Sequence, residues 1–512
     1  MGIFEKLMKK TERPRSSTRG FYFGATEAEG ENIQGQSLID YFEDYLDILS
    51  DLEKGKFIFV GRKGVGKSAI AKFIKDTSDL TNESYAKLLR VNDFEIEKHI
   101  QLEEKNHEKK EKMIFEWLIL VNIIKLIVSH ECGQYTAEYD KLKKFLDVNA
   151  GIVNVDQYQF VEGTKQKGGQ VSFGGLKHVF GGIFKNYFDT KVNKAEFYKL
   201  IPPLKEIVKV MLDFEVNRDL EFWLLFDDLD INFNVKDDRD NVKIMELLRV
   251  AKEYNNEIFR NNTTRILLFI RDDIRDEIAP KYEDSAKIFN TYQTSLNWYD
   301  HRLYTEKSEE LIPLKKLANR RIKINFDKNE ISYGTDPWLT LFQDENYSGS
   351  DYPKKSSFKY ILDFTFYRPR DIITFLNTMT DESCTYPLNK GAVKSLLKKF
   401  VDINITEIKS ELKLFFSDTE ISKIFNELFP YIIQKQNVKP KDVQDKIEQL
   451  SFELNRNKVF DILINYSLII YMDSSGTLYF NYRDNTTLGN VNKSELYMSL
   501  PKCIYHYYKR IN

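Results

Sequence analysis

The sequence predicts an α/β protein in which helices sandwich a parallel sheet, followed by two further, mainly helical domains. Continuous apolar runs have the composition of strands that are buried on both faces; they occupy residues 57–60, 222–226 and 266–270. A glycine-rich loop, GRKGVGKS at 61–68, separates the first run from a helical pattern. Helical spacing then dominates after residue 311, up to a hairpin pattern at 468–482.

Length and composition set the class of protein. The chain has 512 residues, too many for one hydrophobic core, so about two to four domains are expected. The formal net charge is −2, which indicates neither a global basic field for nucleic acid nor an acidic solvating chain. Three scattered cysteines and six scattered histidines disfavour a disulfide framework and a zinc site, and they favour a cytoplasmic location.

No segment has the pattern of a membrane span or a signal peptide. The N-terminal 20 residues are basic and lack an apolar core, so a flexible arm is expected. The most apolar stretch, 113–130, contains Glu116, Asn122 and Lys125. A span needs about 20 nearly uncharged residues, so this stretch is expected to be a buried helix, and no membrane partner is expected.

The loop at 61–68 satisfies G-x-x-x-x-G-K-[ST], and its place between a buried strand and a helix favours phosphate binding. Glycines let successive N–H groups turn inward, and the helix starting near Lys67 adds the positive end of its dipole. Lys67 is expected to pair with the β- and γ-phosphates, and Ser68 to coordinate Mg²⁺. The predicted nucleotide-binding residues of this loop are Gly61, Arg62, Lys63, Gly64, Val65, Gly66, Lys67, Ser68 and Ala69.

A second element, EFWLLFDDLDINF, offers the acidic groups that a phosphate site needs. The apolar run 222–226 ends in Asp227 and Asp228. Asp227 is predicted to serve Mg²⁺ through its water shell, and Asp228 to act as the general base on the attacking water. The alternative is an acidic turn at a strand end.

A third run, 266–270, ends at Arg271. Ligands of open α/β sheets bind beyond the carboxyl ends of the strands, so Arg271 is expected to reach the γ-phosphate and to act in catalysis. The alternative is an ion pair with Asp272 or Asp273. A further strand is expected at 291–298.

A fourth element, LDFTFYRPRDIITFLN at 362–377, carries two arginines. Pro369 predicts a helix start between Arg368 and Arg370. Two arginines at that end are disfavoured by the helix dipole, which suggests an anionic partner, either the nucleotide or acidic neighbours.

The segment between Ser68 and Asp227 has 158 residues, whereas a βαβ unit needs about 30. One strand is expected at 86–96, and the rest is expected to be an insertion at about 97–215. Paired glycines at 167–184 suggest a hairpin within it.

Together these motifs resemble the AAA+/STAND-like P-loop ATPases, and most of all their bacterial, origin-recognition-like branch, which includes many defence-linked proteins. The resemblance spans roughly residues 20–380. It implies a P-loop NTPase sheet, ATP and Mg²⁺ as cofactors, Asp227–Asp228 as Walker B, and residues 23–46 as a lead-in near the adenine. It also implies Arg271 as sensor 1, although an arginine there matches STAND switches better than typical AAA+ enzymes, and Arg368 or Arg370 as sensor 2.

The same resemblance implies a homo-oligomer or a protein partner. Such proteins often complete the site with an arginine from a neighbour, for which three residues are candidates: Arg239, Arg249 and Arg260.

The C-terminal third has helices followed by a hairpin, which suggests a winged-helix-like domain. Residues 401–512 contain 14 Lys/Arg and 14 Asp/Glu, so charge does not indicate DNA binding, although DNA stays an open alternative to protein contact.

Four regions are therefore expected. They are a flexible basic arm and lead-in at 1–35, a P-loop ATPase domain at 36–310, a helical lid at 311–395 and a winged-helix-like domain at 396–512. The predicted function is an ATP-hydrolysing regulatory switch, expected in a defence or stress system. The alternatives are a DNA-binding AAA+ initiator or loader gated by ATP, and a scaffold that binds ATP without turnover. The absence of [NT]-K-x-D disfavours a GTPase, and a small-molecule kinase stays open.

Overall fold

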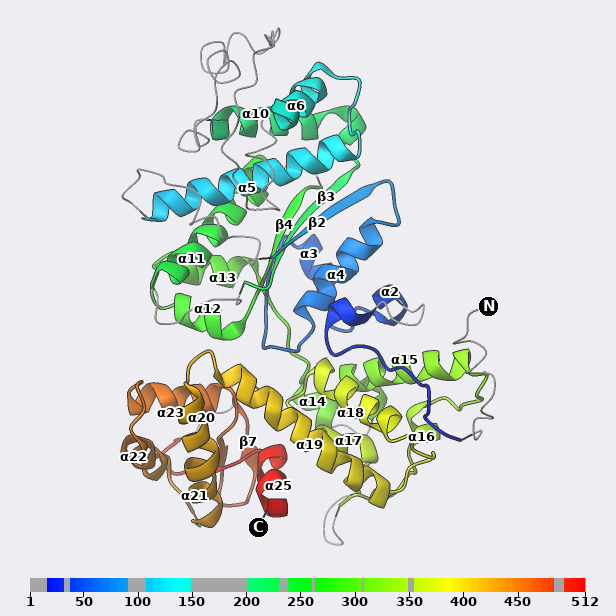
Figure 1. Cartoon of the computed structure of the whole chain (residues 1–512), viewed down its shortest axis with the longest axis vertical. Coiled ribbons are helices and arrows are strands. Elements are labelled where there is room, and N and C mark those ends of the chain that lie inside the picture. Colours follow the sequence, from blue (N-terminus) through cyan, green and yellow to red (C-terminus); the bar gives the residue numbers. More distant parts are fainter. Residues whose placement is uncertain are drawn as a thin grey trace. The chain divides into compact units, whose positions relative to one another are not determined.

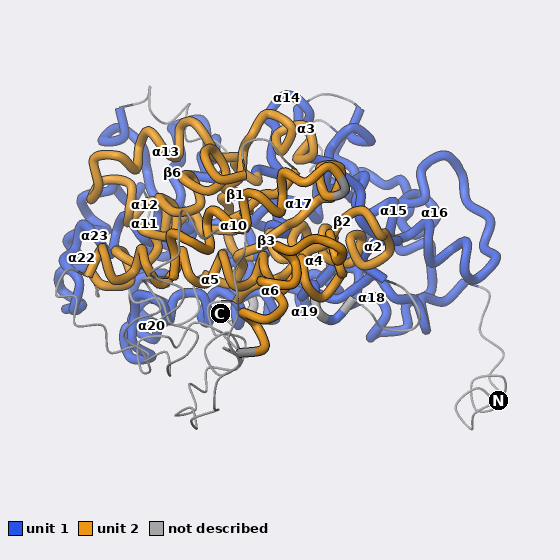
Figure 2. The backbone as a smooth tube through the Cα atoms, turned by 90° about the horizontal axis from the view of Figure 1, so that it is seen from above, with its two compact units in different colours: residues 1–46, 64–66, 297–512 blue, residues 47–63, 67–296 orange. Residues whose placement is uncertain are grey.

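A computed structural model describes most of the chain, and its contacts divide the chain into two compact units (Figure 2). Unit 1 comprises residues 1–46, 64–66 and 297–512, and unit 2 comprises residues 47–63 and 67–296. The described residues are 16–31, 37–90, 107–148, 200–229, 238–259, 263–305, 308–348, 354–435, 437–482 and 492–511. The N-terminal arm to residue 15, the glycine-rich segment 167–184 and Arg260 lie outside them.

Unit 2 is built around a five-stranded sheet in which all paired strands are parallel. Across the sheet the strands are β2 (Ser84–Arg90), β3 (Glu221–Asp227), β4 (Arg265–Ile270), β1 (Ile58–Val60) and β5 (Gln293–Ser295). The predicted parallel α/β sheet is thus confirmed. Two strands differ from expectation: β2 begins at Ser84, before residue 86, and β5 is shorter than 291–298 because a helix extends to Tyr292. Residues 91–96 of the strand expected at 86–96 lie outside the described residues.

The central strands are apolar because both of their faces are covered. All three residues of β1 are at most 2% exposed, as are Leu224–Phe226 of β3 and Ile266–Ile270 of β4. Burial of one such side chain contributes about 1.5–3 kcal/mol, so an uninterrupted apolar run is favoured where both faces are shielded from water.

Helices cover the two faces of this sheet. Helix α4 (Lys67–Ser78) packs on β2, β3 and β4. Figure 1 shows it on the opposite side of the sheet from α11 (Asp238–Glu253), α12 (Asp272–Ile278) and α13 (Ser285–Tyr292). The other helices that the structure describes in unit 2 are α3 (Ile48–Glu53), α5 (His107–Ser129), α6 (Ala137–Val148), α10 (Ile201–Asp213), η4 (Glu215–Asn217) and η5 (Tyr254–Ile258).

Helix α5 contains the most apolar stretch of the sequence and lies in the interior. It packs against α10, α11, the edge strand β2 and its neighbour β3. Ile119, Leu120 and Val121 are completely buried, so the predicted buried helix is confirmed. Among the described helices, none combines the length and the apolar character needed to cross a membrane.

Residues 301–412 of unit 1 are mainly helical. The helices there are α14 (His301–Thr305), η6 (Glu309–Leu311), α15 (Pro313–Lys328), α16 (Trp338–Leu341), α17 (Ser357–Leu362), α18 (Pro369–Asp381) and α19 (Lys390–Leu412). Proline occupies the first turn of α18, as the sequence predicts.

The N-terminal lead-in packs on this helical region. Thr18 Oγ1 donates to the Met379 carbonyl at 2.7 Å, and the Tyr22 amide donates to Asn325 Oδ1 at 2.7 Å. Phe23 is fully buried. Two short helices follow along the lead-in, η1 (Ala28–Glu31) and α2 (Leu38–Tyr41).

The C-terminal part of unit 1 combines helices with a small sheet. The helices are α20 (Asp418–Lys423), η7 (Ile424–Leu428), α21 (Phe429–Gln434), α22 (Pro440–Leu450), α23 (Arg456–Asn465) and α25 (Lys502–Ile511). Strands β6 (Ile470–Met472) and β7 (Leu478–Tyr479) form the predicted hairpin, which is confirmed. A third antiparallel strand, β8 (Tyr497–Ser499), pairs with β6 and was not predicted.

Candidate functional site

The carboxyl ends of β1, β3 and β4 meet at one edge of the sheet in unit 2. The chain leaves β1 toward β2 at one side of the sheet, whereas it leaves β4 toward β5 at the other side. Adjacent strands whose connections diverge in this way mark the crevice where open α/β sheets bind ligands. The Gly61 amide continues the sheet hydrogen bonding by donating to the Ile270 carbonyl at 3.2 Å.

The glycine-rich loop starts at this edge and has the backbone conformation that its glycines permit. Gly64 has φ +82° and Gly66 has φ +101°, both in the region that favours glycine. A Cβ added at Gly66 would meet no atom within 4 Å, so the space beside it is open. The loop runs directly into α4, whose 12 residues begin at Lys67. Inward-turned amides followed by a helix N-terminus form an anion-binding arrangement.

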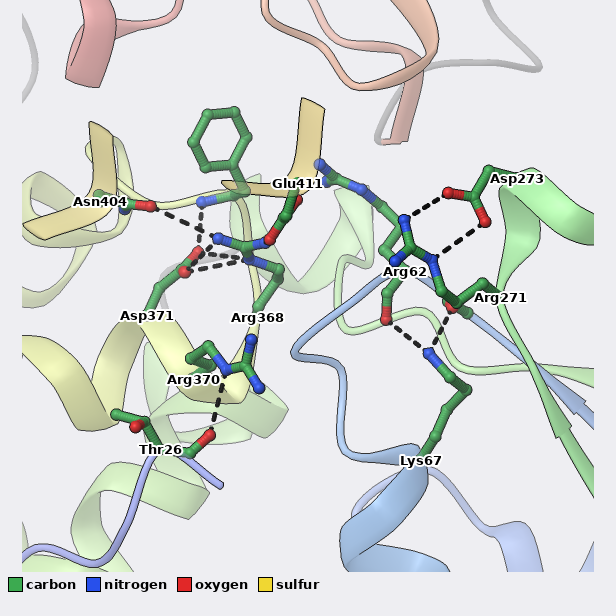
Figure 3. A network of polar contacts seen from close by, with 12 residues as sticks. Thr26, Arg62, Lys67, Arg271, Asp273, Arg368, Arg370, Asp371, Asn404 and Glu411 are labelled. Carbon is green, nitrogen blue, oxygen red and sulfur yellow. Dashed lines mark hydrogen bonds and ion pairs between the residues drawn. The ribbon is translucent and has the colours of Figure 1, made fainter. Parts of the chain in front are cut away.

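The side-chain ammonium of Lys67 lies at the start of the loop. Its Nζ donates to the Gly61 carbonyl at 2.8 Å and to the Arg62 carbonyl at 3.0 Å (Figure 3). Both of these acceptors are backbone carbonyls, which carry no net charge. Ser68 follows in the first turn of α4.

The two acidic residues at the end of β3 differ in environment. Asp227 is the last strand residue and is 2% exposed. Asp228 follows with φ +55°, a left-handed conformation that is uncommon outside glycine but tolerated by aspartate. Asp227 ends β3, which runs parallel to β1 in the same sheet, so both acids lie at the edge where Gly61 follows β1.

Arg90 is a residue of this edge that the sequence analysis missed. It ends β2 directly opposite Asp227 in the strand register, and its Nε lies 3.5 Å from Asp228 Oδ2. The only signal for Arg90 in the sequence was its place in the run that predicts a strand. An arginine at the end of a strand does not by itself indicate a functional site. Its side chain is 36% exposed, so the ion pair is only partly shielded from water.

Arg271 also lies at this edge, and its charge is balanced locally. Its Nε donates to Asp273 Oδ1 at 3.1 Å and its Nη2 donates to the other oxygen of the same carboxylate. Next to this pair, burial and the negative charge of Asp273 raise the pKa of Asp272. Positive charges at Arg62, Lys67 and Arg271 oppose that rise. Acids and cations are therefore concentrated beyond β1 and β4.

The two arginines around Pro369 have different surroundings in unit 1. Arg368 is 1% exposed and its guanidinium is hydrogen-bonded to Asp371, Glu411 and Asn404 (Figure 3). Attraction to these two carboxylates outweighs burial and raises the pKa of Arg368. The anionic partner expected for Arg368 is thus provided by the protein itself.

Arg370 instead lies against the glycine loop. Residues Gly64–Gly66 group with unit 1, and a Cβ at Gly64 would come within 3.2 Å of the Arg370 Cβ. The Arg370 amide is 3.4 Å from the Gly64 carbonyl, and its Nε donates to the Thr26 carbonyl at 3.1 Å. Its two Nη groups make no hydrogen bond to any residue that the structure describes.

Trp298 makes a second contact with the middle of the loop. Its indole Nε1 donates to the Val65 carbonyl at 2.8 Å, in a buried environment. The peptide units at Gly64 and Val65 are thus each held by a named residue of unit 1.

The arginines considered for action on a neighbouring subunit are not equally available. Arg249 donates through Nε and Nη2 to both oxygens of Asp284, each at 2.8 Å, and it also pairs with Glu246. These hydrogen bonds raise the pKa of Arg249 and hold it within its own unit. Arg239 lies in the first turn of α11, and Arg260 lies outside the described residues.

The residues present fit a magnesium-bound triphosphate. The open space beside Gly66 is where a Cβ would otherwise lie, and the loop leads into a helix N-terminus and the Lys67 ammonium. Asp227 supplies a buried carboxylate and Ser68 a hydroxyl, which are oxygen donors of the kind that Mg²⁺ prefers.

Comparison with known proteins identifies one similar domain. Residues 313–394 match the family model described as the FunZ-associated C-terminal helical domain. The matched segment runs from α15 into the first turn of α19 and is similar to that helical domain. The comparison with curated proteins finds no match to the chain.

Proposed function

We propose that the chain binds Mg²⁺-ATP at Gly61–Ser68 and hydrolyses it as a nucleotide-dependent regulatory switch. The observation that carries the proposal is the loop itself: two positive-φ glycines, an ammonium and a helix N-terminus directly follow a buried strand. The carboxyl edge of the same sheet carries Asp227 and Asp228, the acidic groups that such a site requires.

Each loop and edge residue then has one task. Lys67 pairs with the β- and γ-phosphates, while Ser68 and Asp227 hold Mg²⁺, which supplies charge neutralisation for the phosphates. Asp228 orients a water molecule and accepts its proton. ATP is favoured over GTP because the sequence has no guanine-reading [NT]-K-x-D motif.

Of the two arginines around Pro369, we assign the phosphate contact to Arg370. The carboxylates of Asp371 and Glu411 already neutralise Arg368. Arg370 lies at Gly64 with its two Nη groups available for a charge-assisted hydrogen bond. In this proposal Arg271 releases its hydrogen bonds to Asp273 and donates to the γ-phosphate instead.

The AAA+/STAND resemblance, which spans roughly residues 20–380, supports this proposal. A parallel sheet followed by a helical segment is compatible with that resemblance. We infer that ATP binding and release change how this helical domain holds the loop.

We further infer that the region predicted at 396–512 contains, after α19, a winged-helix-like module at 413–512 that contacts protein. Helices α22 and α23 precede the β6–β7 hairpin, which is the order of that fold. Residues 401–512 contain 14 Lys/Arg and 14 Asp/Glu. A region without net positive charge does not favour binding to DNA phosphates, so the DNA-gated loader is the weaker alternative.

Binding and turnover measurements on the full chain test this function. A fluorescent ATP analogue should bind saturably in the presence of Mg²⁺ and be displaced by ATP far better than by GTP. Inorganic phosphate should be released, and EDTA should stop the release. Saturable binding without any phosphate release would favour the scaffold alternative, and strong salt-sensitive stimulation by duplex DNA would favour the loader. Absence of binding at millimolar ATP would refute the proposal.

A further inference from the structure

Arg368 is the centre of a buried polar cluster that joins two helices of unit 1. The cluster consists of Arg368, Asp371, Asn404 and Glu411, and we call it the clamp. Arg368 Nε and Nη2 donate to Asp371 Oδ1 at 3.0 and 2.8 Å, and Nη1 donates to Glu411 Oε1 at 2.8 Å (Figure 3). Each of the four residues is at most 6% exposed. Asn404 and Glu411 lie two turns apart on one face of α19.

The clamp also fixes the chain that carries Arg370. The Phe366 amide donates to Asp371 Oδ2 at 2.7 Å, and the Asp371 amide donates to the Arg368 carbonyl at 3.1 Å. These bonds close a loop around residues 366–371, so the backbone at Arg370 has little freedom. Arg370 itself touches Gly64, the first left-handed glycine of the nucleotide loop.

We propose that Arg368 is a positioning residue which, through the clamp, couples the placement of Arg370 at the nucleotide loop to helix α19. The inference rests on the proposed ATP function and adds its route of regulation. When Arg370 moves toward a phosphate, the segment 366–371 moves with it, and Glu411 and Asn404 transmit the shift to α19. By linkage, a partner that moves α19 changes the affinity of the loop for nucleotide by the same factor.

Helix α19 is suited to carry this signal into the C-terminal module. It has 23 residues, ends at Leu412 directly before that module, and packs against α25. Glu407 lies between the two clamp residues of α19, and burial raises its pKa while Arg368 and Arg370 oppose the rise. Both arginines are therefore within electrostatic reach of the same helix.

A double-mutant cycle on the full chain tests the coupling, with affinity for a fluorescent ATP analogue as the readout. Glu411→Gln keeps the shape of the side chain but removes its charge, and we expect affinity to fall about fivefold. Arg370→Ala should lower affinity about tenfold. In the double variant the effect of Glu411→Gln should nearly vanish, because the clamp acts only through Arg370. Additive effects would mean that the clamp is merely structural and would overturn the inference.

Hydrogen–deuterium exchange supplies the second readout. ATP should slow exchange at 404–412 in the natural protein, and this protection should be lost in Glu411→Gln. Glu411→Asp, which keeps the charge, serves if the glutamine variant does not fold. Glu382→Gln is the matched control, because it breaks the exposed pair with Lys399 in the same helical region and should change neither readout.

The outcomes separate the two proposals. If the natural protein binds ATP but its affinity and protection survive Glu411→Gln, the coupling is wrong and the ATP function stands. If the natural protein does not bind the analogue at all, the ATP function fails, and the coupling fails with it.

Discussion

Arg90 and Asp228 form an ion pair at the carboxyl edge of the sheet, with Nε 3.5 Å from Oδ2. The pair joins the end of β2 to the residue that follows β3, and these two strands are in register through Arg90 and Asp227. The guanidinium competes with water for the carboxylate oxygens, so the pair restrains the residue that we propose as the general base.

Replacement of Arg90 should therefore raise basal turnover. We expect Arg90→Ala to increase kcat about twofold to fivefold with unchanged ATP affinity, since a partly exposed pair contributes at most about 1 kcal/mol. Arg90→Lys, which keeps the charge, should stay near the natural rate. Steady-state phosphate release measures both, and a slower Arg90→Ala enzyme would show that the pair aids catalysis.

Removal of the acid itself should separate binding from hydrolysis. Asp228→Asn should retain ATP and lower kcat by about 10²- to 10⁴-fold, because the amide cannot accept the proton of the attacking water. Single-turnover hydrolysis and equilibrium binding, measured on the same sample, give the two numbers. Parallel losses in both would argue for a structural role at the strand end.

Lys67 should be required for nucleotide binding. Lys67→Ala removes the ammonium that lies at the Gly61 and Arg62 carbonyls, and ATP binding should become undetectable at micromolar concentrations. Lys72→Ala is the matched control in the same helix, because Lys72 pairs with Asp76 outside the loop. Unchanged ATP affinity in Lys67→Ala would refute the assignment of the loop.

The buried partner of Arg368 should matter for stability. Asp371→Ala leaves the arginine with one carboxylate and the Phe366 amide without its acceptor, which should cost about 3–5 kcal/mol. The exposed Asp381→Ala, at the other end of the same helix, should cost less than about 0.5 kcal/mol. Thermal melting followed by circular dichroism compares them, and equal melting temperatures would contradict the prediction.

The hairpin turn should lose order only at strongly acidic pH. Hydrogen bonds from Ser475 and the Thr477 amide lower the pKa of Asp473 to about 2. Because the folded value lies below the ordinary one, this stabilisation is complete above about pH 4 and is lost as pH falls toward 2.

Amide exchange of 470–480, corrected for its intrinsic pH dependence, should show that transition in the natural protein. Asp473→Asn carries no charge at any pH and should lack it. The same pH dependence in both proteins would rule out Asp473 as its source.

The sequence predicts those parts of the fold that local pattern determines. Phe57–Val60 and Ile266–Ile270 could only be buried strands, because an apolar run of that length needs shielding on both faces. The Asp473–Gly476 turn identified the hairpin, whereas β8 has three residues in an irregular stretch and no periodicity to detect. The start of β2 was placed two residues late, because the apolar pattern alone does not tell where pairing begins.

The candidate site was predictable to a similar extent. The loop and the two acids are local motifs, and topology placed them at one edge. The roles of Arg368 and Arg370 could not be separated, because Glu411, which neutralises Arg368, lies 43 residues away in sequence. Arg90 was missed because its partner is also distant in sequence. Asp228 follows a strand that comes after the long segment between Ser68 and Asp227.

The indole of Trp298, held by the Val65 carbonyl, gives the chain a built-in optical reporter. Its emission depends on the polarity and hydrogen bonding around Nε1, so a rearrangement of the peptide at Val65 changes its wavelength or intensity. Nucleotide titrations can thus be followed without any label, and Trp298→Phe identifies which part of the signal originates at the loop.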